Sequence, residues 1–149
     1  MSDLEKIIND VWKNKNQVNQ NSDISIIDAI NQIIDLLDQG KVRVAEKIKG
    51  EWITHQYIKK AIMLSFRIYG METLAGPYSS WDDKAHLLKG KTAGWTKEDF
   101  EKAGFRMVPN SPVRKGSYIA KNVVLMPCFI NTGAYIGSGT MMDLSLIHI

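Results

Sequence analysis

The chain has 149 residues, of which 44% are hydrophobic and 23% charged, as expected of a globular protein with one domain or two small ones. Its net charge of +3 is spread along the chain and its lysines form no long basic run, so nucleic-acid binding has little support. The single cysteine excludes an internal disulfide. Because there is neither a secretion signal nor an apolar run of membrane length, we expect a cytoplasmic protein.

Two amphipathic helices are predicted in the first forty residues. The first has apolar residues at helical spacing: Leu4, Ile7, Ile8, Val11 and Trp12. The polar segment 14–21, rich in Asn and Gln, is predicted to be a loop. The second helix has an apolar face made of Ile26, Ile27, Ile30, Ile33, Ile34 and Leu37. Gly40 follows at a position where a left-handed residue commonly ends a helix, so we expect the second helix to end there.

A β-hairpin and a third helix are predicted next. Apolar residues lie on both sides of a Lys-Gly pair: Val42, Val44 and Ile48 before it, Trp52 and Ile53 after it. This pattern predicts a hairpin that turns at Gly50. Thr54 can cap the third helix, whose buried side is predicted to consist of Tyr57, Ile58, Ala61, Ile62, Leu64 and Ser65. The segment from Gly70 to Ser80 is predicted to be a loop.

A short helix and a break precede the last third of the chain. Thr96 and Asp99 approximate a capping box for a helix that ends near Ala103 and Gly104. Two prolines within residues 108–112 preclude a helix and favour an extended chain. We therefore expect a mainly helical domain over residues 1–108 and a different unit from residue 109 onward.

Aliphatic residues in the last third recur at steps of six, with one step of five: Val113, Ile119, Val124, Ile130, Ile136 and Met142. Four positions after the first five of these come small or β-branched residues: Ser117, Val123, Cys128, Ala134 and Thr140. A strand repeats every two residues and a helix every 3.6, so neither produces this pattern. A hexad with an aliphatic corner fits a left-handed parallel β-helix, in which each hexad forms one side of a triangular coil.

The predicted fold class is therefore α+β. It comprises an N-terminal helical domain with a β-hairpin and, over residues 109–143, the first coils of a left-handed parallel β-helix. Ile119, Ile130 and Ile136 are expected to point into the coil and stack on one another. The run covers only about two coils, fewer than a solenoid generally needs, so an ordinary meander of short strands is the alternative. The hexads indicate a hexapeptide-repeat acyltransferase.

Longer sequence words surround these hexads: residues 43–48, 54–56 with 59–61, 65–68, 104–109, 123–127, and 133–135 with 139–143. Together they resemble the tetrahydrodipicolinate N-succinyltransferase family, weakly over the first forty residues and strongly from Gly104 onward. The resemblance implies transfer of succinyl from succinyl-CoA, a cosubstrate, to the amine of L-2-amino-6-oxopimelate, the open form of tetrahydrodipicolinate. This step belongs to diaminopimelate and lysine synthesis, and the resemblance implies a cytoplasmic homotrimer with active sites between subunits.

Two segments depart from the family pattern. Residues 81–94 do not clearly reproduce its Asp-Lys-Val-Pro element. The family continues after Asp143 with Thr-Trp-Ala-Thr-Val-Gly and further coils, whereas this chain continues with Leu-Ser-Leu-Ile-His-Ile. Because residues 144–149 resemble the translation of a transposase adapter, we expect an artefactual tail on a truncated, inactive fragment. A genuine terminal strand is the alternative.

Two residues are candidates for the site. Arg106 lies in the Gly-Phe-Arg word, where the resemblance implies substrate binding, and a guanidinium fork suits a carboxylate. Asp143 matches a substrate-binding aspartate of the family; it could orient the substrate ammonium or accept its proton, so we assign it a catalytic role as well. No cofactor-binding residue or prosthetic group is expected, because the residues that bind CoA in the family lie in later coils.

Other reactive side chains favour no further site. Three scattered histidines, His55, His86 and His148, argue against a zinc site, and His55 is expected to bond locally. Cys128 is expected to be a core thiol, since no base lies beside it in sequence. Two alternative functions stay open at this point: another hexapeptide-repeat acyltransferase, and a non-catalytic helical interaction module.

Overall fold

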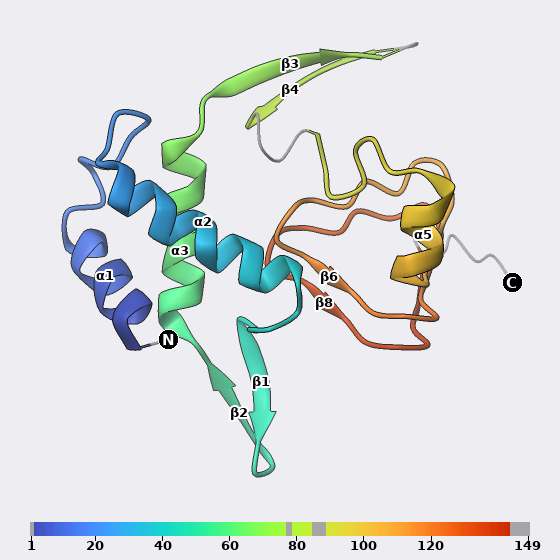
Figure 1. The fold of residues 1–149 in the computed structure, drawn as a ribbon, viewed down its shortest axis with the longest axis horizontal. Coiled ribbons are helices and arrows are strands. Elements are labelled where there is room, and N and C mark those ends of the chain that lie inside the picture. Colours follow the sequence, from blue (N-terminus) through green and yellow to red (C-terminus); the bar gives the residue numbers. More distant parts are fainter. Residues whose placement is uncertain (1, 77–78, 85–88, 144–149) are drawn as a thin grey trace, which may run out of the picture.

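Three helices form the N-terminal part of the computed structural model, which describes residues 2–76, 79–84 and 89–143 (Figure 1). Helices α1 (Ser2–Lys13), α2 (Ile24–Asp38) and α3 (Gln56–Ile68) confirm the three predicted here, and residues 14–21 contain no helix or strand. They enclose one core of buried apolar residues: Ile8, Val18, Ile30, Ile33, Ile34, Leu37, Ile58, Ala61, Leu64 and Ile68. The expected artefactual tail, residues 144–149, lies outside the described residues.

The end of α2 follows the prediction, whereas the start of α3 does not. Gly40 has a φ of +69°, and the N–H groups of Gly40 and Lys41 bond to the carbonyls of Leu37 and Leu36, both at 2.9 Å. These two bonds form a Schellman motif. Thr54 does not cap α3, because it pairs with a residue of the neighbouring strand, and the residue after it occupies the cap position.

Two antiparallel hairpins are present where one was predicted. Strands β1 (Ala45–Ile48) and β2 (Glu51–Thr54) confirm the first, which turns through Lys49 and Gly50, both at positive φ. Strands β3 (Met71–Ala75) and β4 (Ser80–Lys84) form the second, so the predicted loop from Gly70 to Ser80 is wrong. Both strands are largely exposed, and the alternation of apolar and polar residues that marks a half-buried strand is therefore absent.

Helix α5 (Lys97–Ala103) has the predicted capping box. The Thr96 N–H donates to the Asp99 carboxylate at 2.8 Å, and the Asp99 N–H donates to the Thr96 hydroxyl at 3.4 Å. Gly104 ends the helix at a φ of +73°, as expected of a left-handed cap residue.

The last third of the described chain consists of short strands that pair in parallel. Strands β5 (Arg106–Met107), β7 (Val124–Leu125) and β9 (Met141–Met142) form one ladder, and β6 (Tyr118–Ile119) and β8 (Tyr135–Ile136) form another. A parallel bridge between Val113 and Ile130 marks a third. The chain visits the three ladders in turn and returns to each after 17 or 18 residues, as the partners Arg106, Val124 and Met141 show. A meander of antiparallel strands does not have this pairing.

The hexad prediction places one corner wrongly. Val113, Ile119 and Ile130 are buried as expected, and Ile136 packs against the same core while partly exposed. Val124, however, is only partly buried, whereas Leu125 is fully buried. The five-residue step therefore lies between Leu125 and Ile130, because the ladder aligns Met107, Leu125 and Met142 on the inner side.

Ion pairs join the helical part to the ladders at the end of α2. The Asp38 carboxylate accepts hydrogen bonds from Lys91 Nζ at 2.6 Å and from the Gly116 N–H at 2.9 Å. Lys115 pairs with Asp35 at 2.8 Å, and this hydrogen bond raises the pKa of Lys115. The Lys91 side chain is only 10% exposed, so its charge depends on Asp38.

Aromatic rings pack at the same junction. The rings of Tyr118 and Tyr135 lie 4.7 Å apart between centroids, and the Arg43 guanidinium lies 3.5 Å from the Tyr135 ring. The junction is therefore a packed contact as well as an electrostatic one. Among the described residues, no helix is long and apolar enough to cross a membrane.

Candidate functional site

Arg106 is positioned by the turn that ends α5 and by an aromatic cluster. Gly104 reverses the chain, and Phe105 is buried against Trp95 and Phe100, with ring centroids 5.8 and 5.9 Å away. The Arg106 N–H then donates to the Val123 carbonyl at 2.9 Å, which starts the first strand of the β5–β7–β9 ladder. Because Phe105 and Met107 lie on the inner side, Arg106 points outward, and it is exposed.

Asp143 lies at the other end of the same ladder. It follows Met142 directly, and the Met126 N–H donates to the Met142 carbonyl at 2.9 Å. Asp143 is exposed, whereas Met142 packs against the inner core. Its carboxylate lies close enough to Cys128 to contribute to the raised pKa of that thiol, although burial is the larger cause.

Arg106 and Asp143 thus lie on strands β5 and immediately after β9, with β7 between them. Neighbouring strands are separated by about 4.8 Å and successive residues by about 3.3 Å, so two strand steps and two residues along the ladder place their backbones about 12 Å apart. Among the described residues, Arg106 makes no ion pair and no side-chain hydrogen bond. Its guanidinium is therefore available to an anionic ligand.

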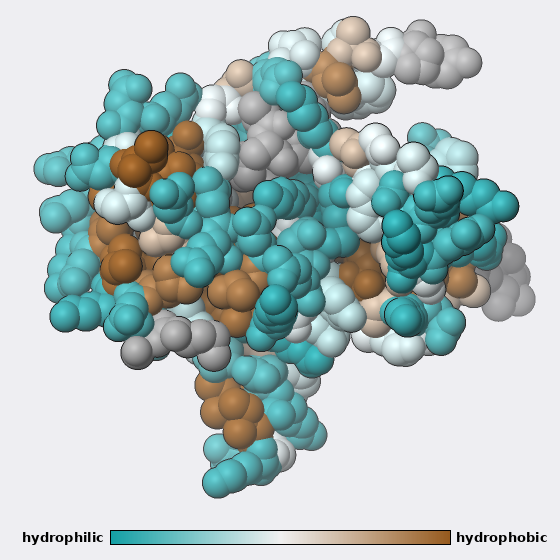
Figure 2. All heavy atoms as spheres, viewed as in Figure 1, coloured by the Kyte–Doolittle hydropathy of each residue, from teal (hydrophilic) through white to brown (hydrophobic). Residues whose placement is uncertain are grey.

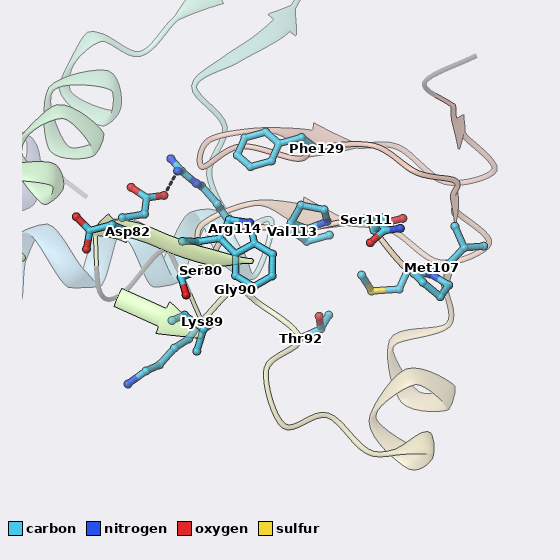
Figure 3. Close-up of a pocket in the computed structure, with 17 residues that line it drawn as sticks. Ser80, Asp82, Lys89, Gly90, Thr92, Met107, Ser111, Val113, Arg114 and Phe129 are labelled. Atoms are coloured by element: carbon cyan, nitrogen blue, oxygen red, sulfur yellow. Dashed lines mark hydrogen bonds and ion pairs between the residues drawn. The ribbon is translucent and has the colours of Figure 1, made fainter. Parts of the chain in front are cut away.

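A cavity of about 960 Å³ lies between the β3–β4 hairpin and the ladders (Figure 3). The hairpin contributes Leu74 and Trp81, and the ladder side contributes Val113, Arg114 and Phe129. Neither Arg106 nor Asp143 lines the cavity, although the two residues after Arg106 do. Sequence reasoning missed this cavity because one wall is the hairpin that it described as a loop.

Two ion pairs join the hairpin to other residues that line the cavity. Asp83 pairs with Arg114, whose side chain is 18% exposed, and Glu72 pairs with Lys89 at 3.6 Å. Figure 3 shows the ion pair of Arg114 as a dashed line. The charges of these pairs are compensated within the chain, so the cavity presents mainly the apolar surfaces of its aromatic residues.

The remaining reactive side chains have structural environments. His55 Nε2 lies 2.7 Å from Glu46 across the first hairpin, in agreement with the expected local bond. Cys128 is partly buried, and burial raises the pKa of its thiol, which disfavours the nucleophilic thiolate. In the part of the chain that the structure describes, no three His, Cys, Asp or Glu side chains gather as metal ligands would.

Comparison with known proteins identifies what the chain is similar to. A family profile described as tetrahydrodipicolinate N-succinyltransferase N-terminal matches residues 3–68. The chain is 67% identical over 136 residues to a 2,3,4,5-tetrahydropyridine-2,6-dicarboxylate N-succinyltransferase of Pelagibacter ubique. The aligned residues are 91% of this chain and 50% of that protein. The chain is therefore similar to tetrahydrodipicolinate N-succinyltransferases over the part of them that it spans.

Further relatives carry the same name. One from Parvibaculum lavamentivorans is 45% identical over 96% of this chain and 51% of its own length, and one from Dechloromonas aromatica is 48% identical over 94% and 50%. The chain thus spans about half the length of the curated relatives it matches. The matched residues 3–68 contain α1 to α3 and the β1–β2 hairpin, which confirms the resemblance in the region where it was weakest.

Proposed function

We propose that this chain forms part of an N-succinyltransferase that moves succinyl from succinyl-CoA to the amine of L-2-amino-6-oxopimelate, in lysine and diaminopimelate biosynthesis. The observation that carries the proposal is the placement of Arg106 and Asp143 on one parallel ladder, about 12 Å apart, in a chain whose relatives are named for this reaction. A dicarboxylate with an amine between its ends offers a partner to each of these two groups.

Arg106 would bind a substrate carboxylate. A guanidinium donates two parallel hydrogen bonds to a carboxylate, and charge-assisted bonds of this kind are worth about 1.5–3 kcal/mol each. The exposed, outward position of Arg106 and its lack of an acidic partner among the described residues support this role.

Asp143 would act on the substrate amine. Attack on a thioester requires a neutral nitrogen, so the ammonium must lose a proton before or during bond formation. A carboxylate beside the amine can orient the ammonium and accept that proton. The nitrogen then forms a bond to the succinyl carbonyl carbon, and the thiolate of CoA leaves.

We also propose that residues 109–143 are the first coils of a left-handed parallel β-helix and residues 1–108 a mainly helical domain. The three ladders visited in turn every 17 or 18 residues support this. CoA would bind along further coils, since the relatives are about twice as long as this chain. The active enzyme would be a cytoplasmic homotrimer with its sites between subunits.

Steady-state kinetics on the full-length gene product test the proposal, with CoA release as the signal. Arg106→Ala should raise KM for the amino acid by about 100-fold or more, because it removes two bonds of about 1.5–3 kcal/mol each, and Arg106→Lys should recover part of the loss. Asp143→Asn should lower kcat by about 10²-fold or more with less effect on KM. Lys102→Ala, an exposed cation on α5, is the matched control and should leave both constants unchanged.

Two results would contradict these roles. Near wild-type constants for both variants would remove Arg106 and Asp143 from the site. Absence of succinyl transfer by the unaltered full-length product, with activity on a different acyl acceptor, would replace the proposed reaction by that of another acyltransferase.

A further inference from the structure

The outer face of the β5–β7–β9 ladder carries apolar side chains. Arg106 pairs with Val124 and Val124 with Met141, so these three residues point to the same side of the ladder. Met126 follows Val124 by two positions and points to that side as well, and its N–H continues the ladder by donating to the Met142 carbonyl at 2.9 Å. Met141 is 62% exposed, and Val124 and Met126 are each partly exposed. We call Val124, Met126 and Met141 the apolar strip.

The apolar strip does not belong to the interior of the ladders. Met107, Leu125 and Met142, which alternate with the outward residues, pack in the inner core. Among the described residues, none of the three strip residues packs against that core or against the core of the helical part. An outward position on a solvent-facing strand is usually polar, so a run of apolar side chains there indicates an external contact.

Opposite charges distinguish this strip from other exposed apolar surface of the molecule. Figure 2 shows hydrophobic side chains on the projecting β1–β2 hairpin, where Trp52 is 73% exposed, but nothing in the structure says what covers them. The apolar strip, by contrast, has the Arg106 cation on one side and the Asp143 carboxylate on the other, at the first and last strands of the ladder. The two charges limit the kind of ligand that fits this face.

The order of groups along this face is a cation, an apolar surface and a carboxylate. Arg106 and Val124 line one hollow of about 420 Å³, so the guanidinium and the first strip residue share a cavity. Met126 lies opposite Asp143 on the neighbouring strand, with about 4.8 Å between the two strands. The complementary ligand has a carboxylate at one end, saturated carbons in the middle and an ammonium at the other end. A straight-chain α-amino dicarboxylic acid has this arrangement.

We propose that the apolar strip binds the aliphatic carbons of the acceptor and thereby selects its chain length, with Met126 as the residue that matters most. This inference rests on the proposed function, because it requires Arg106 and Asp143 to hold the two ends of the acceptor. With both ends held, an acceptor of matching length lies along the strip, whereas an acceptor that is one carbon shorter cannot reach both ends and keep that contact. One methylene in an apolar site changes kcat/KM by about 10- to 200-fold. Met126 lies beside Asp143, so its contact with the chain also positions the carbon that carries the amine.

Steady-state kinetics with two acceptors test this selection on the full-length gene product. L-2-aminopimelate has a methylene in place of the keto group and cannot cyclise, and L-2-aminoadipate is one methylene shorter. The unaltered enzyme should prefer the longer acceptor by about 10- to 200-fold in kcat/KM, and Met126→Ala should lower this ratio by about fivefold or more. Met126→Leu, which nearly conserves volume and stays apolar, should keep the ratio within about twofold. Met63→Ala, at a position on α3 that is 52% exposed, is the matched control and should leave the ratio unchanged.

The selectivity ratio separates this role from a structural one, because a loss of folded enzyme lowers kcat/KM for both acceptors alike. Val124→Ala, a smaller truncation in the same strip, should lower the ratio in the same direction. An unchanged ratio in both Met126→Ala and Val124→Ala would overturn the inference and leave the proposed succinyl transfer intact. A smaller assembly in light scattering together with an unchanged ratio would likewise overturn it and assign the strip to a contact between copies. If the unaltered enzyme transfers succinyl to neither acceptor, the proposed function fails, and the inference fails with it.

Discussion

Replacement of Gly40 by alanine tests how tightly the helical part packs on the ladders. Gly40 has a φ of +69°, where an L-residue costs about 1–2 kcal/mol. A Cβ at this position would also lie 2.6–2.8 Å from three atoms of the Tyr118 ring. Real Cβ atoms do not approach so closely, so the ring or the backbone must move, and overpacking of this kind costs about 1–3 kcal/mol. The total loss in the free energy of unfolding should be about 2–5 kcal/mol.

Gly94 is the matched control for the backbone contribution. Its φ is +76°, but a Cβ there would have no atom within 4 Å. Gly94→Ala should therefore cost only the backbone strain, about 1–2 kcal/mol. The difference between the two variants isolates the contact between Gly40 and Tyr118.

Urea denaturation followed by circular dichroism provides the measurement, with the unaltered protein as reference. Gly40→Ala should shift the midpoint clearly further than Gly94→Ala, at the same slope. Equal midpoints for the two variants would show that the end of α2 does not press on the Tyr118 ring, and would refute the close packing described for this junction.

Two further predictions concern the charges of the junction and of the candidate site. Asp38→Ala should lower the free energy of unfolding by about 3–5 kcal/mol, because it leaves the nearly buried Lys91 ammonium without its carboxylate. Asp10→Ala breaks an exposed pair and should leave the urea midpoint nearly unchanged. Similar urea midpoints for the two variants would show that the loss of Asp38 does not leave a buried, uncompensated charge at Lys91. Asp143→Asn should lower the pKa of the Cys128 thiol part of the way to its ordinary value, because burial, the larger cause of the raised pKa, is unchanged. A larger thiolate fraction should then speed the alkylation of Cys128 by iodoacetamide at pH 8. An unchanged rate would place the Asp143 carboxylate away from Cys128.

Local signals account for the parts of the fold that were predicted correctly. The apolar residues of α1, α2 and α3 repeat at 3.6 residues and so lie on one face of each helix. Such a face is stable in water only when it is buried against another element. Gly40 and the Thr96–Asp99 pair act through bonds to residues within a few positions. Such features need no knowledge of the rest of the chain.

Two errors have a common physical origin. The β3–β4 hairpin is exposed on most of its surface, so burial imposes no alternation on its sequence. The inner corner at Leu125 could not be separated from Val124, because both are aliphatic and adjacent. The register that decides between them is set by pairing with Met107 and Met142, which are 17 or 18 residues away.

The sequence by itself determined the helical part, the hexad character of the last third, the family resemblance and the two candidate residues, because each rests on a local pattern or a short word. Only the tertiary structure decided that Arg106 and Asp143 lie at one ladder, that Asp38 compensates Lys91 across 53 positions, and that a cavity lies between the β3–β4 hairpin and the ladders. These relations depend on how distant segments are brought together. A periodicity of two, 3.6 or six residues states which side of an element is buried, but not which other element covers it.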